Sequence, residues 1–438
     1  MFKQEEQLTF GPRGHFLNHL QCFSPDDEWV VYDTRNDDTQ IQQTSSIEMV
    51  NTATKEIRVL YQVSQPNAHG PGVGAATFSP VADQVIFIHG IRNSNADRPY
   101  AFTRRTGVSI QLAQPGEPIF MDARNIYPPF TPGALRGGTH AHSWSGDGKW
   151  IVFTYNDEII AQLAKTNPDR KDLRTVGVMF PKPVPVGAEA TGENNSGEMF
   201  TVLVAEVTEN PMPGSDQIDR AFDETWVGKT GYQKTDGTWQ KRAIAFQGNV
   251  RTLAGKLQTE VFMVDLPDED TLTVARDPDW PLAGTESQLP GIPKGVVQRR
   301  ISFTPDGLSG PRFWLRSTPD GKWIAFLAKD QQGIINIFAI SPNGGPIKQL
   351  TFNREPISGQ FNFSSDGKII AYVAGGKIHL TETESGMTQQ IEQNHLPGEE
   401  PTGAVVWANR RNDLIYNRYI HEGNDKYLQV FILKGKDK

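Results

Sequence analysis

The 438-residue sequence has a single cysteine, Cys22, so an internal disulfide is excluded. Because Cys22 lies inside a predicted strand, we expect a small buried residue there rather than a nucleophile. No apolar run approaches the ~18 residues of a membrane helix, and the opening MFKQEEQLTF lacks the apolar stretch of a signal peptide. We therefore expect a soluble cytoplasmic protein, or a periplasmic one if a leader has been removed.

The motifs of several large enzyme classes are also absent. The sequence has no P-loop, no Rossmann glycine pattern, no H-E-x-x-H and no G-x-S-x-G, so ATP hydrolysis, hydride transfer and serine esterase chemistry have no support. Charged residues make up only 21% of the chain and the formal net charge is −8. Because phosphate binding requires a basic face, we expect neither a nucleic-acid nor a membrane partner. The oligomeric state is left open.

What the sequence does contain is a repeat, in which an aromatic or small residue precedes a Ser/Pro/Asp/Gly turn and an alternating apolar stretch. The copies are FSPDDEWVVYD from Phe23, FSPVADQVIFI from Phe78, WSGDGKWIVFT from Trp144, STPDGKWIAFL from Ser317, FSSDGKIIAYV from Phe363 and a weaker WANRRNDLIYN from Trp407. Asp and Gly are typical of turns, and β-branched and aromatic residues are typical of strands. Each copy therefore predicts a β-hairpin.

The spacing of the copies predicts the architecture. The last three begin at 317, 363 and 407, which are 46 and 44 residues apart. Propeller blades of four strands have this length. The gap from 144 to 317 holds one degenerate copy, with an inner strand at 198–207, further strands at 243–250 and 260–267, and an outer strand within 295–304. We therefore predict an all-β, seven-bladed β-propeller of four-stranded blades.

The two ends of the chain predict how the ring closes. The last blade stops one strand short, and the tetrapeptide QLTF at 7–10 matches the QLTF at 349–352, where an outer strand is expected. We therefore expect the strand at Gln7 to Phe10 to complete the last blade, leaving no free sheet edge. A β-sandwich, the alternative, explains neither the period nor the matched ends.

The least regular part of the chain is 181–300, which we assign to an enlarged fourth blade with loop and helix insertions. It contains a proline-rich stretch at 181–197 and a polar loop at 231–241. Asp216 followed by Asp219 resembles a capping box and predicts a short helix within 215–228. Insertions on repeat arrays often build a binding face, although a variable decoration is an equal alternative.

Histidines on the inner strand of the third blade are candidate metal ligands. His140 and His142 are two residues apart, so on a regular strand their side chains project to the same face. A divalent metal (Mn, Zn or Ca) needs a third ligand from another strand, and we choose His69. The other candidates for this third position are His89, Asp122 and Gln298. The alternative is that the histidines are hydrogen-bonded fillers between blades.

Arginines and aromatic residues form the second candidate group. Arg136, Arg300 and Arg316 are the candidate catalytic residues, because guanidinium groups at a channel mouth bind carboxylates bidentately. The candidate substrate-binding residues are Arg299, Arg312, Trp314 and Tyr127. Together they suit an acidic oligosaccharide or another small molecule at the channel mouth. The alternative is that the arginines form ion pairs between blades.

Three resemblances add to this interpretation. The hairpin units resemble the TolB-type propeller repeat. Long strings such as YPPFTPGALRGGTHAHSWS, PGSDQIDRAFDETWVG and GVVQRRISFT resemble the YidR-like family of uncharacterised bacterial proteins. More distantly, the His-x-His of His140 and His142 is similar to the metal motif of oligogalacturonate lyases, which are seven-bladed propellers holding a divalent metal mainly through histidines. Gly137 stands where that motif has a glutamine.

The lyase resemblance implies a carbohydrate-active, metal-dependent enzyme that cleaves oligouronides by β-elimination. In that reaction a metal and an arginine neutralise the C6 carboxylate and a base removes the C5 proton. The alternative is a non-enzymatic, TolB-like propeller that binds a protein or a glycan. A calcium-dependent lactonase or a glycoside hydrolase ranks lower, because channel-facing carboxylates are scarce in the strands that the sequence places.

Overall fold

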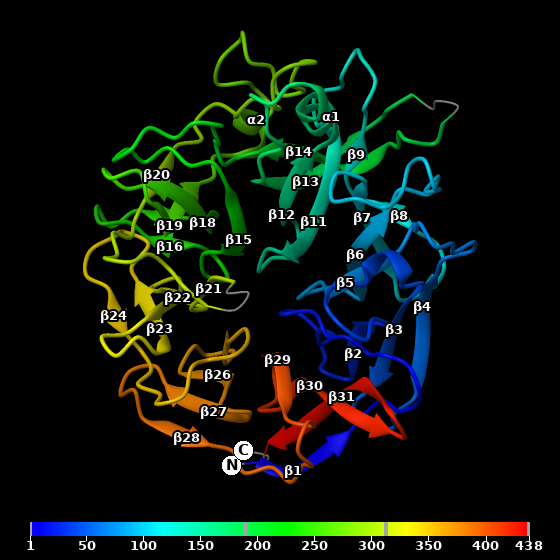
Figure 1. Cartoon of the computed structure of the whole chain (residues 1–438), viewed down its shortest axis with the longest axis vertical. Helices are drawn as coiled ribbons and strands as arrows, with labels where there is room; N and C mark the ends of the chain where they lie inside the picture. Colours follow the sequence, from blue (N-terminus) through cyan, green and yellow to red (C-terminus); the bar gives the residue numbers. More distant parts are fainter. Residues whose placement is uncertain (1, 188–190, 311–313, 436–438) are drawn as a thin grey trace.

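A computed structural model describes residues 2–187, 191–310 and 314–435. It confirms the seven-bladed ring: successive sheets are arranged around a central space, and both chain ends lie at the same blade (Figure 1). In the described residues, no helix is both long enough and apolar enough to cross a membrane.

The first three blades occupy residues 16–203. Blade 1 consists of β2 (Trp29–Asp33), β3 (Ser46–Asn51) and β4 (Ile57–Gln62), with the 3-10 helix η1 (Ile41–Gln43) between β2 and β3. Blade 2 consists of β5 (Val73–Phe78), β6 (Gln84–Gly90), β7 (Arg105–Gln111) and β8 (Ile119–Phe120). Blade 3 consists of β11 (Gly137–Trp144), β12 (Ile151–Asp157), β13 (Thr175–Val184) and β14 (Gly197–Leu203), with helix α1 (Glu158–Thr166) after β12. A short parallel pair, β9 (Ala123–Arg124) and β10 (Ala134–Leu135), lies between blades 2 and 3 in the chain.

The other four blades follow in chain order. Blade 4 consists of β15 (Ala221–Trp226), β18 (Ala243–Arg251), β19 (Leu257–Asp265) and β20 (Gln298–Arg300), with the small hairpin of β16 (Tyr232–Gln233) and β17 (Trp239–Gln240) and helix α2 (Glu269–Leu272). Blade 5 consists of β21 (Arg316–Ser317), β22 (Ile324–Lys329), β23 (Ile335–Ile340) and β24 (Lys348–Gln349). Blade 6 consists of β25 (Asn362–Phe363), β26 (Ile369–Ala374), β27 (Lys377–Glu382) and β28 (Thr388–Gln390). Blade 7 consists of β29 (Pro401–Trp407), β30 (Leu414–Glu422), β31 (Asp425–Gly435) and β1 (Phe2–Gln7).

Blade 1 departs from the predicted four strands. Its inner segment makes only two isolated bridges to β2, Phe16 to Asp33 and Phe23 to Val30. The sheet of blade 1 is therefore three-stranded, with residues 16–23 lying where an inner strand would be.

The repeated turn explains why these segments form hairpins. In blade 1 the Ser24 hydroxyl donates to Asp26 (2.5 Å) and accepts from the backbone N–H of Trp29 (3.0 Å). The same two bonds recur in three further blades, through Ser145, Thr318 and Ser364. The Ser/Thr-x-Asp pattern thus fixes the turn, and the alternating residues after it bury one face against each neighbouring blade. Apolar clusters accordingly lie between blades, for example Val31, Phe78 and Phe87 between blades 1 and 2.

Closure of the ring by the N-terminal strand is confirmed, with different bounds. The strand β1 ends at Gln7 and pairs antiparallel with β31, so Gln7 is the last residue of the strand and residues 8–10 follow it. The second QLTF behaves in the same way, because β24 ends at Gln349. In both copies the glutamine amide donates to the carbonyl two residues later, at 2.7 and 2.8 Å. The matched tetrapeptides therefore mark the same point of two blades.

Two expectations about 181–300 were wrong. Residues 198–207 do not begin blade 4; most of them form β14, the outer strand of blade 3, which pairs with β13. Inner and outer strands have the same alternating pattern of apolar residues, so the sequence alone did not show which of the two 198–207 forms. The helix expected within 215–228 is instead strand β15, because its pairing with β18 overrides a local capping signal. The segment 181–300 thus contains the end of blade 3 and all four strands of blade 4.

Candidate functional site

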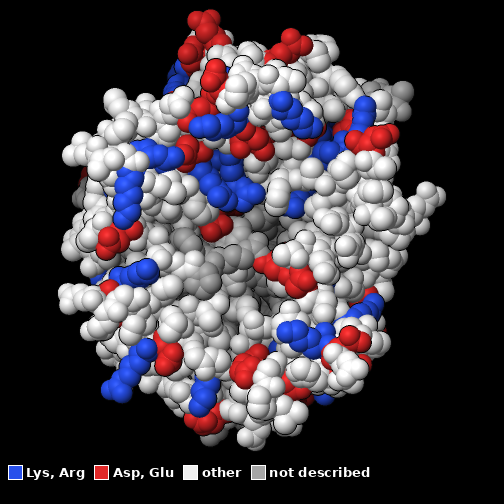
Figure 2. All heavy atoms as spheres, viewed as in Figure 1, with Lys and Arg blue, Asp and Glu red and all other residues white. Residues whose placement is uncertain are grey.

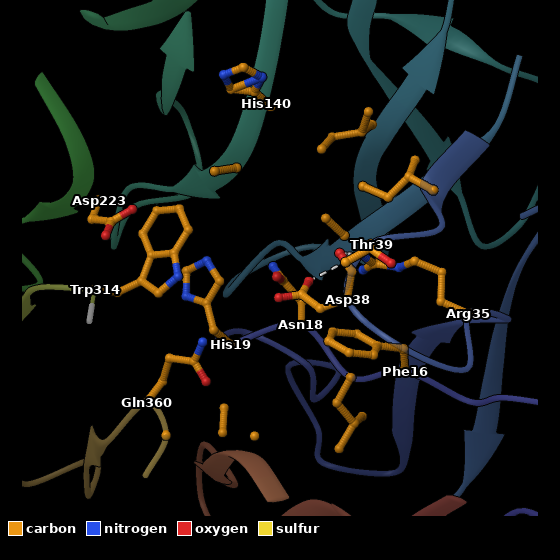
Figure 3. Close-up of a pocket in the computed structure, with 18 of the residues that line it drawn as sticks. Phe16, Asn18, His19, Arg35, Asp38, Thr39, His140, Asp223, Trp314 and Gln360 are labelled. Carbon is orange, nitrogen blue, oxygen red and sulfur yellow. Dashed lines mark hydrogen bonds and ion pairs between the residues drawn. The ribbon is translucent and has the colours of Figure 1, made fainter. Parts of the chain in front are cut away.

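A cavity of about 800 Å³ lies at the centre of the ring. All seven blades contribute to its wall, and Figure 3 shows side chains from several of them converging on it. Figure 2 shows the same region as a hollow in the surface, with a group of basic side chains along its upper edge. The cavity is therefore the place where the ring brings chemistry-bearing residues together.

Bulges in the inner strands determine which side chains reach the cavity. In β5, β11, β15 and β29 the pairing register shifts, and a residue with positive φ lies at the shift. These residues are Ala75 (φ 56°), Ala141 (60°), Asp223 (54°) and Gly403 (72°). All four line the cavity. A bulge changes the face to which the following side chains point.

The bulge at Ala141 separates the two candidate metal ligands. His140 precedes it and lines the cavity, whereas His142 is not part of the cavity lining. The Nε2 atom of His142 lies 3.0 Å from the Thr139 hydroxyl, and burial lowers the pKa of His142 to about 3. The expectation that both rings project to the same face fails, because it assumed a regular strand.

The third ligand chosen from the sequence lies elsewhere. His69 is exposed in a loop, where its backbone N–H donates to Asn67 (2.8 Å). The alternative third ligands are engaged in other contacts: His89 with Tyr61, Asp122 with Thr106, Gly107 and Thr139, and Gln298 with Glu206. Within the described residues, no three His, Cys, Asp or Glu side chains are grouped so that they could hold a metal ion. The donor set implied by the resemblance is therefore not assembled.

The arginines chosen as catalytic have structural partners. Arg136 is fully buried and pairs with Asp157 (2.9 Å). Arg300 lies on the outer strand β20, where it pairs with Glu260 (3.1 Å). None of the three chosen arginines belongs to the cavity lining. Arg316 comes nearest, since its guanidinium donates to Nδ1 and to the carbonyl oxygen of His19, which does line the cavity (2.9 Å each).

The three expected substrate-binding residues that the structure describes are also dispersed. Arg299 is on the outer strand, donating to the Pro342 carbonyl (2.7 Å), and Tyr127 is in an exposed loop. Arg312 lies outside the described residues. Of the three described residues, only Trp314 lines the cavity, where its ring stacks on that of His19 at a centroid distance of 4.1 Å.

Four arginines outside the candidates predicted from the sequence form part of the cavity wall. Arg35 forms a buried ion pair with Asp33 (2.7 Å). The other three are Arg105, Arg174 and Arg220. They come from three successive blades, at or just before the first residues of β7, β13 and β15. The guanidinium groups of Arg105 and Arg174 lie 4.4 and 5.3 Å from the centre of the same Phe102 ring. In the described part of the chain, none of the three forms an ion pair with a carboxylate within 4 Å.

Arg105 is the most buried of the three, at 7% exposure. Burial is the main cause that lowers the pKa of Arg105 to about 10, so it stays charged at neutral pH. Its Nη1 donates to Nδ1 of His140 (3.3 Å), and its Nε has no hydrogen-bond partner among the described residues. Burying a cation without a carboxylate partner costs free energy, and a bound anion would lower that cost, so the site favours an anionic ligand.

His140 adds an uncharged donor to this wall. Burial, followed by the charge of Arg105, holds the pKa of His140 well below its usual range, so the ring is neutral. Because arginine only donates, Nδ1 of His140 accepts and its proton is on Nε2. That Nε2 has no hydrogen-bond partner in the described chain.

Two adjacent carboxyl groups lie next to the arginines, Asp223 in the cavity wall and Glu224 behind it. Burial raises the pKa of Asp223 to about 6 and that of Glu224 to about 8. Glu224 accepts from the Thr154 hydroxyl (2.8 Å) and is 2% exposed. At neutral pH the cavity therefore has an ionised Asp223, whereas Glu224 is mostly protonated.

No motif in the sequence indicates these residues. Arg105 is the first residue of β7, Arg174 and Arg220 end the connections before β13 and β15, and Asp223 lies in a segment predicted to be helical. All three arginines are outside the repeated turn motif. The usable signal was positional: each arginine begins or immediately precedes a strand, and strand ends meet at the mouth of a propeller.

The comparisons with known proteins agree with this architecture. Residues 72–194 match the family model described as a protein of unknown function (DUF3748). An oligogalacturonate lyase in complex with manganese is similar in structure, with 10% identity, a TM-score of 0.55, and coverage of 98% of this chain and 92% of that one. An oligogalacturonate lyase from Vibrio parahaemolyticus is also similar in structure, with 10% identity and a TM-score of 0.51. That match covers 98% of this chain and 93% of the lyase. At this identity the likeness shows the fold alone.

A sequence relative is much nearer. The uncharacterized protein YidR of Escherichia coli (strain K12) is 38% identical over 409 residues, which cover 92% of this chain and 92% of that protein. The chain belongs to the YidR family.

Proposed function

We propose that the central cavity binds an acidic oligosaccharide, specifically an oligouronide, and that the protein cleaves it by β-elimination. The observation that carries this proposal is the convergence of Arg105, Arg174 and Arg220 on one wall without carboxylate partners among the described residues. The two oligogalacturonate lyases that share the ring make oligogalacturonate the first substrate to test.

The arginines supply what β-elimination requires at its first step. A guanidinium fork pairs with the C6 carboxylate through two parallel hydrogen bonds. Neutralising that carboxylate makes the C5 proton more acidic, because the charge that develops as the proton leaves is stabilised by the same fork. The Phe102 side chain, which is 56% exposed, offers an apolar surface for the sugar ring beside the guanidinium groups.

A divalent metal does not enter this proposal, because the described residues do not assemble a donor set for it. We therefore expect protein dialysed against EDTA to bind and cleave oligogalacturonate as well as untreated protein does. The measurement is the initial rate before dialysis, after it, and after adding back MnCl₂. A rate that falls on dialysis and is restored by manganese would show that a metal site forms in spite of the bulge at Ala141.

The test of the proposed function is direct. Purified protein is incubated with trigalacturonate, and the ultraviolet absorbance of the 4,5-unsaturated product is followed; calorimetry measures binding of the same sugar. We expect both signals with trigalacturonate and neither with a neutral galacto-oligosaccharide of equal length. Binding without absorbance would favour the non-enzymatic alternative, a glycan-binding propeller. Absence of both would overturn the proposal.

A further inference from the structure

The cavity wall carries one carboxylate whose position in the fold is unusual. Asp223 lies at the inner-strand bulge of blade 4, in the left-handed region (φ 54°). At the bulges of blades 2, 3 and 7 the same position holds Ala75, Ala141 and Gly403. The bulge therefore does not need a carboxylate, and only blade 4 of these four presents one to the cavity.

The carboxylate of Asp223 is also available to interact with a ligand. It makes no hydrogen bond and no ion pair within 4 Å to the described residues. Figure 3 shows it on the same side of the cavity as Trp314, and its backbone carbonyl accepts from the N–H of Leu315 (3.4 Å). It thus faces the space that the substrate would occupy, on the wall that also holds Arg174 and Arg220.

The groups around Asp223 allow its carboxylate to be ionised at neutral pH, which is the form that accepts a proton. Arg174, Arg220 and Arg316 favour its ionised form, and they do not fully offset the burial that raises the pKa of Asp223 to about 6. Glu224, next in the chain, has a pKa raised to about 8 by burial, so it adds little negative charge at neutral pH. His19 is held by Arg316 and stacks on Trp314.

We infer that Asp223 is the general base that removes the C5 proton of the bound uronide, an assignment that rests on the proposed function. The Asp223 carboxylate forms a bond to that proton, and the C5–H electron pair becomes the C4=C5 double bond. The C4–O4 bond breaks, and its electron pair stays on O4 of the leaving sugar. The proton finally resides on O4, so no water, oxidant or reductant is consumed.

The experiment compares Asp223→Asn with wild type. Asparagine keeps the shape and tolerates a left-handed backbone, but it cannot accept the proton. We expect kcat on trigalacturonate to fall at least ~100-fold while KM changes little, as is usual when a general base is lost. We also expect kcat/KM of the wild type to rise with pH through about 6 and then level, and this limb to disappear in the variant.

Two further variants make the result unambiguous. Asp223→Ala puts at this bulge the residue found in blades 2 and 3, so it should fold and be as inactive as the asparagine variant. Asp172→Asn is the matched control, because burial also raises the pKa of Asp172 to about 6 although it does not line the cavity. The Asp172→Asn variant should keep the wild-type kcat and the rise of kcat/KM with pH through about 6. If the wild type is active and Asp223→Asn is equally active, the assignment of Asp223 as the base is wrong and the proposed function stands. If the wild type is inactive, both the proposed function and the assignment of Asp223 are wrong.

Discussion

Replacing Arg105 with methionine weakens binding of trigalacturonate about 10–100-fold, because one charge-assisted interaction with the substrate carboxylate is lost. Methionine retains most of the length of the side chain, so its contacts with the Tyr100 and Phe102 rings are largely kept. The melting temperature should be unchanged or higher, since a buried charge without a carboxylate partner no longer has to be desolvated. The combination of weaker binding and undiminished stability is what distinguishes a ligand-binding arginine from a structural one.

The measurement is calorimetric titration of trigalacturonate together with thermal unfolding. The matched control is Arg92→Met, because Arg92 also stacks on a phenylalanine, Phe120 (4.7 Å), but is exposed and outside the cavity. This variant should bind like wild type. If Arg105→Met keeps full affinity and instead lowers the melting temperature, Arg105 serves the fold and the proposed binding mode is wrong.

Removal of residues 2–7 is expected to prevent the propeller from closing into a stable folded ring. These residues form β1, whose ladder with β31 places a run of backbone bonds at the closing edge. Glu5 accepts hydrogen bonds from Tyr416 and from Gln393 (2.9 Å), and it pairs with Arg418 (3.0 Å). With each buried group left unpaired costing about 1–3 kcal/mol, the total approaches the whole stability of a typical domain.

Expression level, gel filtration and thermal unfolding of the truncated protein test this. We expect aggregation or loss of the cooperative transition, and partial recovery when a peptide of residues 1–9 is added. A point-mutant pair separates charge from strand pairing: Glu5→Ala should lower stability by about 2–4 kcal/mol, because Arg418 is only 5% exposed. Glu6→Ala removes ion pairs with Lys434 and Lys55, which are 33% and 40% exposed, and should cost less than about 1 kcal/mol. A truncated chain that melts like wild type would contradict the role assigned to β1.

The sequence predicted the ring and its closure because both leave repeated marks. The Ser/Thr-x-Asp turn is bonded in the same way in four blades, so its spacing reports the blades directly. The two copies of QLTF occupy equivalent places because Leu8 and Leu350 are both buried and the following Thr9 and Thr351 both bond to the neighbouring strand.

The site was less predictable, for a physical reason. Only one of the four inner-strand bulges, at Gly403, has the residue that usually signals a positive φ. The others, at Ala75, Ala141 and Asp223, depend on pairing with the second strand of each blade, which no local pattern encodes. Counting alternate residues therefore placed His142 in the channel and could not place Asp223 there.

The closing blade has a consequence for how the chain is made. Its strands come from distant parts of the sequence: β1 is synthesised before every other strand of the ring, and β31 after every other strand. Blades 1 to 6 are each built from one consecutive stretch of chain and can form during synthesis, because domains and repeats assemble as they emerge. Blade 7 cannot close until β31 has been made, so β1 has no partner strand until then. A chain that ends before β31 therefore leaves the backbone groups of β1 without a partner strand, and such an open edge favours pairing with another chain.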